Sequence, residues 1–337
     1  MRLEGLDSLL ASLSQQGFRT IGPTVRDEAI IYDDIETCSD FPIGWTDEQE
    51  GGHYRLKRRE DQALFGYVVG PHTLKRFLHP PKQSLWRAEK TEGGYRFEGP
   101  AIPDRPFAFV GVRPCDIRAM AIQDRVFEDG AYKDAHYMAR RKDAFIVAVN
   151  CAQAAATCFC TSMGSGPKVE RDFDLALTEL DLAGDHRFLV EVGTEHGRQM
   201  LGELPHDEAT PADIGAAETT SEKTAASMTR KMPAGEVRDL LMRNLEHPRW
   251  EEVAERCLSC GNCTMVCPTC FCTEVDEDTQ FTNDVVSRSR QWTSCFNLDF
   301  SYIHGGSIRH SASSRYRQWI THKLATWHDQ FDESGCV

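Results

Sequence analysis

Short apolar runs alternate with amphipathic segments along the first 200 or so residues of the chain. The runs at 107–112 (FAFVGV), 144–149 (AFIVAV) and 187–192 (RFLVEV) are rich in Val and Phe and have the length of buried strands. Helical patterns follow the first run at 117–127 and the third at 196–204. This alternation is typical of a substantially parallel sheet with helices on its faces.

Further elements precede these strands. Residues 1–17 have the pattern of a short amphipathic helix. Residues 18–35 are predicted to form two extended strands joined by a turn at Gly22–Pro23. The apolar run at 64–69 (LFGYVV) predicts another strand, and a helix is predicted at 74–78.

The pattern changes after residue 202. Residues 203–233 are poor in large apolar side chains and rich in Ala, Thr and Glu, which is typical of a linker or a loosely packed helical excursion. Beyond them the pattern predicts two short helices broken at Pro248. We therefore expect an α/β domain at 1–202, a linker at 203–233 and a small helical domain at 234–337, so that the fold class is α/β or α+β.

Composition restricts the function. The chain has 337 residues, of which 40% are hydrophobic and 27% charged, as in an ordinary globular protein. Its net charge of −14 argues against a nucleic-acid partner, which requires a basic surface. No apolar stretch approaches the length of a membrane span, and the N-terminus lacks the features of a signal peptide. We expect a cytoplasmic protein without membrane contact.

Thirteen cysteines are the outstanding feature of the composition. Six of them fall between Cys257 and Cys272. The number is odd and no secretory signal precedes them, so a disulfide framework explains them poorly. Cysteines packed this closely in a reducing compartment are better explained as metal ligands.

The densest run is Cys257-x2-Cys260-x2-Cys263-x3-Cys267-Pro268, the spacing of bacterial ferredoxins. Three cysteines at two-residue intervals wrap a loop around one [4Fe–4S] cluster, and the fourth points toward a second cluster. Zinc is the competing metal, but structural zinc sites usually separate two Cys-x2-Cys pairs by a dozen or more residues. The spacing therefore favours iron–sulfur.

A second ferredoxin-type run is expected to complete the pair of clusters. Cys336, in the last four residues Ser334–Val337, has the position of its first cysteine. We interpret the sequence as a fragment cut within that second motif, and the alternative is that Cys336 is an unligated terminal thiol. Three more cysteines are candidates for substitute ligands or for neighbours that tune a cluster: Cys270, Cys272 and Cys295.

Four cysteines lie beyond predicted strand ends of the first domain: Cys115, Cys151, Cys158 and Cys160. Cys115 follows the run at 107–112, Cys151 follows the run at 144–149, and the other two share the loop of Cys151. Ligand sites in parallel sheets gather at the carboxyl ends of strands. The hypothesis is that these four hold a further iron–sulfur cluster, and the alternative is that they pack as small hydrophobic side chains. Arg113 beside them is a group that tunes a cluster, a group that binds an acidic ligand, or an ordinary loop charge. The remaining cysteine, Cys38, is isolated and expected to be structural.

Strings distributed over nearly the whole chain carry a family resemblance. They are Asp40–Trp45 (DFPIGW), Gly52–Leu56 (GHYRL), Gly111–Ile117 (GVRPCDI), Thr157–Met163 (TCFCTSM), Cys257–Cys272, Trp292–Cys295, and Gly305-Gly306 with Arg309. On these residues the chain resembles the iron–sulfur β subunit of cytoplasmic NiFe sulfhydrogenases, which is similar to the iron–sulfur subunit of anaerobic sulfite reductase.

The resemblance implies two [4Fe–4S] clusters in a helical ferredoxin-like domain. It also implies electron relay between a catalytic subunit, either of a NiFe hydrogenase or of a sulfite reductase, and a flavin- and NAD(P)-binding subunit. A non-catalytic metal-binding regulator is the other function class compatible with the cysteine pattern. We expect no independent active site, because the sequence contains no evident Ser–His–Asp set, flavin motif or nucleotide fingerprint.

Overall fold

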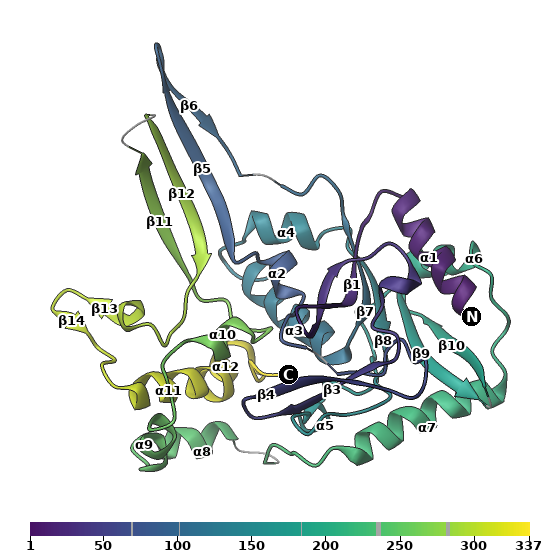
Figure 1. The fold of residues 1–337 in the computed structure, drawn as a ribbon. Coiled ribbons are helices and arrows are strands. Elements are labelled where there is room, and N and C mark those ends of the chain that lie inside the picture. The colour runs from purple at the N-terminus through teal and green to yellow at the C-terminus, as the bar shows by residue number, and fades with distance from the viewer. Residues whose placement is uncertain (69, 101, 183, 234–236, 281–283) are drawn as a thin grey trace.

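The computed structural model describes residues 1–68, 70–100, 102–182, 184–233, 237–280 and 284–337. Figure 1 shows a large body that contains the N-terminus, with a smaller C-terminal part beside it. The body is built on a six-stranded sheet in the order β10-β9-β8-β7-β1-β2. Its strands are β1 (Arg19–Arg26), β2 (Ala29–Asp34), β7 (Phe107–Val112), β8 (Phe145–Val149), β9 (Leu175–Leu182) and β10 (Asp185–Val192). The four inner strands are parallel and the two edge strands pair antiparallel, which confirms the predicted mixed α/β domain.

Helices cover both faces of this sheet. On one face α1 (Leu3–Gln15) buries its leucines against the central strands, and α6 (Glu195–Gly202) packs beside it. On the other face lie α2 (Lys75–Leu78), α3 (Pro114–Phe127) and α4 (Ala135–Arg141). Strands β7 and β8 are buried along their whole length. Strands covered on both faces are continuous apolar runs rather than alternating ones, so the sequence pattern identified them.

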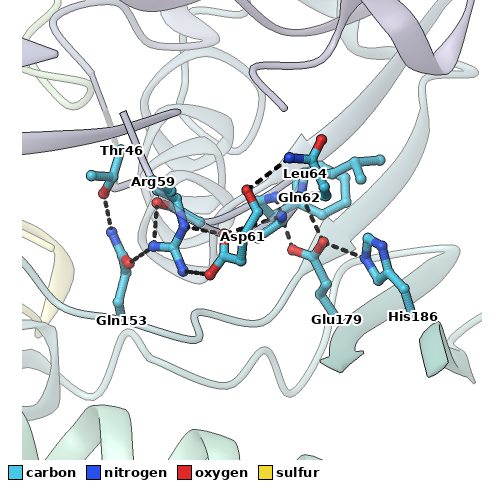
Figure 2. A network of polar contacts seen from close by, with 11 residues as sticks. Thr46, Arg59, Asp61, Gln62, Leu64, Gln153, Glu179 and His186 are labelled. Atoms are coloured by element: carbon cyan, nitrogen blue, oxygen red, sulfur yellow. Dashed lines mark hydrogen bonds and ion pairs between the residues drawn. The ribbon is translucent and has the colours of Figure 1, made fainter. Parts of the chain in front are cut away.

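The run at 64–69 was predicted to be a strand, and this prediction is wrong for residues 64–68, which form no strand; residue 69 lies outside the described residues. The backbone N–H groups of Leu64 and Phe65 donate to the carboxylate of Glu179 at 2.7 and 2.8 Å (Figure 2). The N–H of Val68 donates to Asp47 Oδ1 at 2.7 Å. Carboxylates satisfy the buried backbone that a neighbouring strand would otherwise satisfy, so this apolar segment can be a buried loop.

The turn predicted at Gly22–Pro23 is also misplaced. Both residues lie inside β1, opposite Asp33 and Tyr32 of β2. The chain reverses instead at Asp27 and Glu28, whose φ angles of 46° and 60° lie in the left-handed region. Acidic residues tolerate this conformation less readily than glycine, so the sequence gives a weak signal for the turn.

Residues 203–233, predicted to be a linker or a loosely packed helical excursion, contain the 17-residue helix α7 (Pro211–Ser227). Thr210 and Asp213 form a capping box at its start, and Asp213 also makes an ion pair with Arg187 of β10 at 2.9 Å. Its buried positions are small or polar residues, among them Ala217 and Thr224. Helix α7 therefore packs on β9 and β10 without the large apolar stripe by which sequence analysis recognises a packed helix.

A second sheet joins the two halves of the chain. It has the order β11-β12-β5-β6, formed by β5 (Lys82–Thr91), β6 (Gly94–Glu98), β11 (Thr273–Gln280) and β12 (Val285–Trp292). All its pairings are antiparallel, and it extends away from the body (Figure 1). The pairing of β5 with β12 links residues 82–91 to residues of the C-terminal part. The sequence predicted no strands at 273–292, because strands that are exposed to solvent on both faces have no alternating apolar pattern.

The C-terminal part also contains short helices: α8 (Val237–Arg243), α9 (Arg249–Ala254), α10 (Asn262–Met265), α11 (Ala312–Thr321) and α12 (Trp327–Phe331). A π-helical turn at His322–Thr326 joins the last two. Pro248 separates α8 from α9, as predicted from the sequence. Among the helices that the structure describes, none is long and apolar enough to cross a membrane.

The buried imidazole of His79 generates a pH prediction. Its ring packs between Phe127 and Trp292, and among the described residues neither ring nitrogen has a hydrogen-bond partner. Burial lowers the pKa of His79 to about 3, so the folded protein keeps the ring neutral while the unfolded chain binds a proton below pH ~6.5. The stabilisation is therefore complete above pH ~6.5 and is lost as the pH falls toward 3.

Between pH 7.5 and 5.5 we expect the native chain to lose about 1.4 kcal/mol more unfolding free energy than the His79→Phe variant. Denaturant unfolding at the two pH values measures the difference. Replacement of the exposed His53 by Phe is the matched control and should leave the pH dependence unchanged. Identical pH dependence in the native chain and the His79→Phe variant would contradict the prediction.

Candidate iron–sulfur centres

The first three cysteines of the ferredoxin-type run lie in a tightly curled loop. Ser259 and Gly261 have φ angles of 51° and 71°, and α10 begins directly afterwards. A Cβ atom on Gly261 would lie 2.9 Å from Ser294 Cβ, so this position requires glycine. Burial raises the pKa of Cys263 to about 11, and the thiols of Cys257 and Cys260 contribute to this shift. The loop therefore brings these three thiols into one electrostatic group.

Cys267 lies beyond the other end of α10, in a second group. The segment that carries Cys336 is tied to it, since Thr269 Oγ1 donates to the Gly335 carbonyl at 2.7 Å. Lys323 Nζ donates to the same carbonyl at 3.1 Å and also to Thr269 Oγ1. Burial raises the pKa of Cys336, and the neighbouring Cys267 thiol adds to that effect. Two cysteines far apart in the sequence are thus brought together.

Buried lysines accompany this second group. A hydrogen bond from the Cys270 thiol holds the pKa of Cys267 well below its usual range. Burial acts in the opposite direction, and the positive charge of Lys323 lowers the pKa further. Lys75 Nζ donates to the carbonyls of residues 264, 265 and 267 at 2.9–3.3 Å, and lies 4.0 Å from the centre of the Trp292 ring. Lys75 and Lys323 are both at most 5% exposed. Buried ammonium groups need an anionic neighbour, and thiolates that bind iron supply one.

The remaining cysteines of this part lie next to members of the two groups. Cys270 contacts Cys267. A hydrogen bond from Cys295 lowers the pKa of Cys272 to about 7, and the Thr293 N–H donates to the Cys272 carbonyl at 3.0 Å. Cys295 also interacts electrostatically with Cys263. Each of the three is therefore adjacent to a predicted ligand or to a partner of one.

Across the described ranges, no three His, Cys, Asp or Glu side chains are arranged to hold a single metal ion. The fit of these residues to a cluster rests instead on two observations. The thiols are gathered in electrostatic groups at the two ends of α10. Buried lysines, whose charge needs compensation, lie against the second group. Both observations agree with the multinuclear, negatively charged centre that the motif spacing indicates.

The structure also places the cysteines of the first domain. Cys115 lies in the first turn of α3, Cys151 closely follows β8, and Cys160 is the first residue of α5 (Cys160–Met163). Cys115 interacts electrostatically with Cys151, Cys158 and Cys160. Cys38 is buried in the hydrophobic core, and its backbone N–H donates to Asp7 Oδ1 at 2.9 Å. Electrostatic interactions thus connect Cys115 with the other three cysteines of this set, and Cys38 is separate from them.

The two buried lysines, Lys75 and Lys323, were not predicted from the sequence. Lys75 lies in a four-residue helix and Lys323 in the π-helical turn, far from each other and from the cysteine run in sequence. A single lysine in an amphipathic segment has no local feature that separates it from a surface lysine. The signal appears only when the chain folds and removes both ammonium groups from water.

Comparison with known proteins agrees with this chemistry. Residues 256–337 match the family model of a 4Fe–4S dicluster domain. Sulfhydrogenase 2 subunit beta of Pyrococcus furiosus is 32% identical over 246 residues, which cover 72% of this chain and 70% of that protein. No solved structure matches. The chain therefore belongs to the family of sulfhydrogenase β subunits, iron–sulfur proteins of electron transfer that contain a 4Fe–4S dicluster domain.

Proposed function

We propose that the chain relays electrons between the catalytic subunit of a NiFe hydrogenase and a flavin- and NAD(P)-binding subunit, within a cytoplasmic oxidoreductase complex. The observation that carries this proposal is the pairing of Cys267 with Cys336 beside the buried Lys323, at the opposite end of α10 from the first three cysteines. Two separate thiol groups in one small domain are what a relay needs, whereas a metal-binding regulator needs only one. Membership of the sulfhydrogenase β family supports the choice of partners.

In this proposal Cys257, Cys260 and Cys263 hold one [4Fe–4S] cluster, and Cys267 and Cys336 contribute to a second. When bound, such clusters supply one-electron transfer, with a potential set by charge, hydrogen bonds and burial. The residues of the chain set those terms. Lys323 and Lys75 place positive charge against the second group, and α10 spaces the two groups. Cys270, Cys272 and Cys295 are positioned as further ligands or as hydrogen-bond donors to the ligands.

The domain division forms part of the proposal. Residues 1–202 are the α/β domain, 203–233 connect, and 234–337 are the iron–sulfur domain. The two domains share the sheet that contains β5 and β12, and Arg290 of β12 pairs with Asp134 in the larger domain. The two domains are therefore connected by a shared sheet and a partly buried ion pair as well as by the chain itself.

Exposed apolar side chains support an association with protein partners. They gather around β13 (Tyr302–Ile303) and β14 (Gly306–Ser307), two short strands of the C-terminal part that come after β12 in the sequence. Those more than 40% exposed are Leu298, Phe300, Tyr302, Ile303 and Ile308. An apolar surface of this kind is typical of an interface within a complex.

Removal of Cys267 or Cys336 tests the second centre. We expect Cys267→Ala and Cys336→Ala each to lower the iron content by about four atoms per chain, because each removes a ligand of the same cluster. The double variant should lose no more iron than either single variant. Iron and acid-labile sulfide analysis after anaerobic reconstitution measures this, and electron paramagnetic resonance of the dithionite-reduced protein identifies the lost signal.

Cys38→Ala, at a buried cysteine remote from these sites, is the matched control and should retain all the iron. A double variant that lost twice the iron of each single variant would show that Cys267 and Cys336 serve different centres. A protein that contains zinc and has no visible absorption bleached by dithionite would reject the relay and favour a regulator.

Neutralisation of Lys323 tests the role of buried charge. A unit charge about 7 Å from a cluster is worth roughly 2–3 kcal/mol at an effective dielectric constant near 20, or about 100 mV for one electron. Because a positive charge stabilises the reduced, more negative state, Lys323→Met should lower one reduction potential by about that amount. Lys90→Met, at an exposed site on β5, is the control. Equal potentials in the two variants, measured by redox titration, would contradict the assignment.

A further inference from the structure

The four cysteines of the larger domain meet at one edge of its sheet. Strands β7 and β8 are parallel neighbours, so their carboxyl ends open at the same edge. Cys115 lies two residues after Arg113, which is the N-cap residue of the helix that follows β7. Cys151 lies two residues after the last residue of β8. The topology alone therefore brings these two thiols, from adjacent strand ends, to the position where ligand sites form in such sheets.

The loop after β8 returns the other two cysteines to the same position. The Cys151 N–H donates to the Pro167 carbonyl at 3.1 Å, which closes the loop at its base. Gly166 has a φ angle of 152°, and a Cβ atom there would lie 3.2 Å from Pro114 Cβ and 3.3 Å from Cys160 Sγ. Cys160 Sγ therefore approaches the start of α3, directly beside Cys115, and glycine is the residue that permits this approach.

The thiols are close enough to affect one another. Burial raises the pKa of Cys160 to about 12, and Cys151 and Cys158 add to the shift. Burial and then Asp116, Cys151, Cys160 and Cys158 raise the pKa of Cys115 well above its usual range. As free thiols the four are thus held neutral in a shared environment of low polarity.

The burial of Arg113 is not explained if the four cysteines only pack as free thiols. Its side chain is 1% exposed, and Nη2 donates to the carbonyls of Phe65 and Tyr67 at 2.8 Å each. Its Nε and Nη1 have no hydrogen-bond acceptor among the residues described. The guanidinium interacts electrostatically with Cys151 and Cys115. A buried guanidinium with unsatisfied N–H groups requires a nearby anion.

The carboxyl groups near Arg113 are already engaged. Asp116 accepts a hydrogen bond from Tyr32 Oη at 3.1 Å. Asp47 accepts hydrogen bonds from the Val68 N–H and from Gln49 Nε2 at 2.7 Å each. Arg113 therefore has no bidentate carboxylate partner in the described part of the chain. The Cys151 thiol lies beside its guanidinium instead.

The loop is fixed on its outer side. Gln153 accepts a hydrogen bond from Arg59 Nη1 at 2.7 Å and donates to Thr46 Oγ1 at 2.8 Å (Figure 2). Arg59 also pairs with Asp61, and Thr157 Oγ1 donates to Gln49 Oε1 at 3.2 Å. Thr46 and Gln49 belong to β3 (Trp45–Glu50), which pairs with β4 (His53–Arg58). This hairpin holds the cysteine loop in place, as a ligand loop requires.

We propose that Cys115, Cys151, Cys158 and Cys160 hold a third iron–sulfur cluster, with Arg113 as its buried counter-charge. A cluster bound by four thiolates is anionic, so it supplies the negative charge that Arg113 lacks. Met228 Sδ lies 3.8 Å from Cys160 Sγ and covers the loop from the segment after α7. The inference goes beyond the two-centre relay, because these cysteines lie outside the dicluster domain at 256–337.

The proposed third site adjoins the Cys267–Cys336 site. Arg118 of α3 and Arg125 of the same helix both pair with Glu333, three residues before Cys336. A cavity of about 540 Å³ lies against Cys336. Ser162 and Met163, which follow Cys160, line the same cavity. The third site therefore neighbours the second, as a further member of an electron relay would.

The test uses the whole chain without the five C-terminal cysteines that are proposed as cluster ligands. A variant in which Cys257, Cys260, Cys263, Cys267 and Cys336 are all replaced by Ala should still bind about four iron and four sulfide per chain after anaerobic reconstitution. Addition of Cys158→Ala to this background should abolish binding, and addition of Cys38→Ala should not. Mössbauer spectroscopy of protein loaded with ⁵⁷Fe identifies the bound species.

A single substitution gives a second test, which does not depend on whether the multiple variant folds. Cys158→Ala in the otherwise native chain should lose about four iron and retain the magnetic resonance signals of the C-terminal clusters. Circular dichroism checks that each variant is folded. Full iron retention by Cys158→Ala, or iron in the multiple variant that Cys158→Ala fails to remove, would overturn the proposal. Iron bound at the N-terminal cysteines but not at the C-terminal ones in the native chain would refute the relay but uphold the third site.

Discussion

The charge balance between buried cations and cysteine thiols is the interaction on which the arrangement depends. Lys75, Lys323 and Arg113 are each at most 5% exposed, and each lies against cysteines. Removal of a cation from water is costly unless a negative group approaches it. Hydrogen bonds to backbone carbonyls satisfy part of this requirement in all three cases. In the proposed centres metal-bound thiolates complete it, and metal binding and folding are then linked.

These cations come from parts of the chain that differ in structure. Lys75 belongs to a short helix on the larger domain, yet it caps the carbonyls at the end of α10 in the smaller one. Trp292, at the end of β12, packs over the Lys75 ammonium and donates to the His79 carbonyl at 2.9 Å. The second cysteine group is therefore built by both domains, and the shared sheet fixes their relative position.

The sequence predicted the features that have local signatures. Continuous apolar runs located β7 and β8, and the spacing from Cys257 to Cys267 indicated the cluster chemistry. It did not predict β11 and β12, whose polar sequence pairs with β5 across the chain. It left α7 undecided between a linker and a helical excursion, because the buried face of this helix lacks large apolar residues. The buried loop at 64–68 was mistaken for a strand because Glu179, distant in sequence, satisfies its backbone. In each case a partner far along the chain determines the structure.

Glu333 connects the segment of Cys336 to the larger domain. Arg118 and Arg125 hold it against α3, and Gly335 is held by Thr269 and Lys323. The segment that carries Cys336 is thus fixed at Glu333 by α3 and at Gly335 by the C-terminal part. Cys115, a proposed ligand of the third cluster, lies in the first turn of the same helix. A displacement of α3 would therefore act on Cys115 and on the segment of Cys336 together.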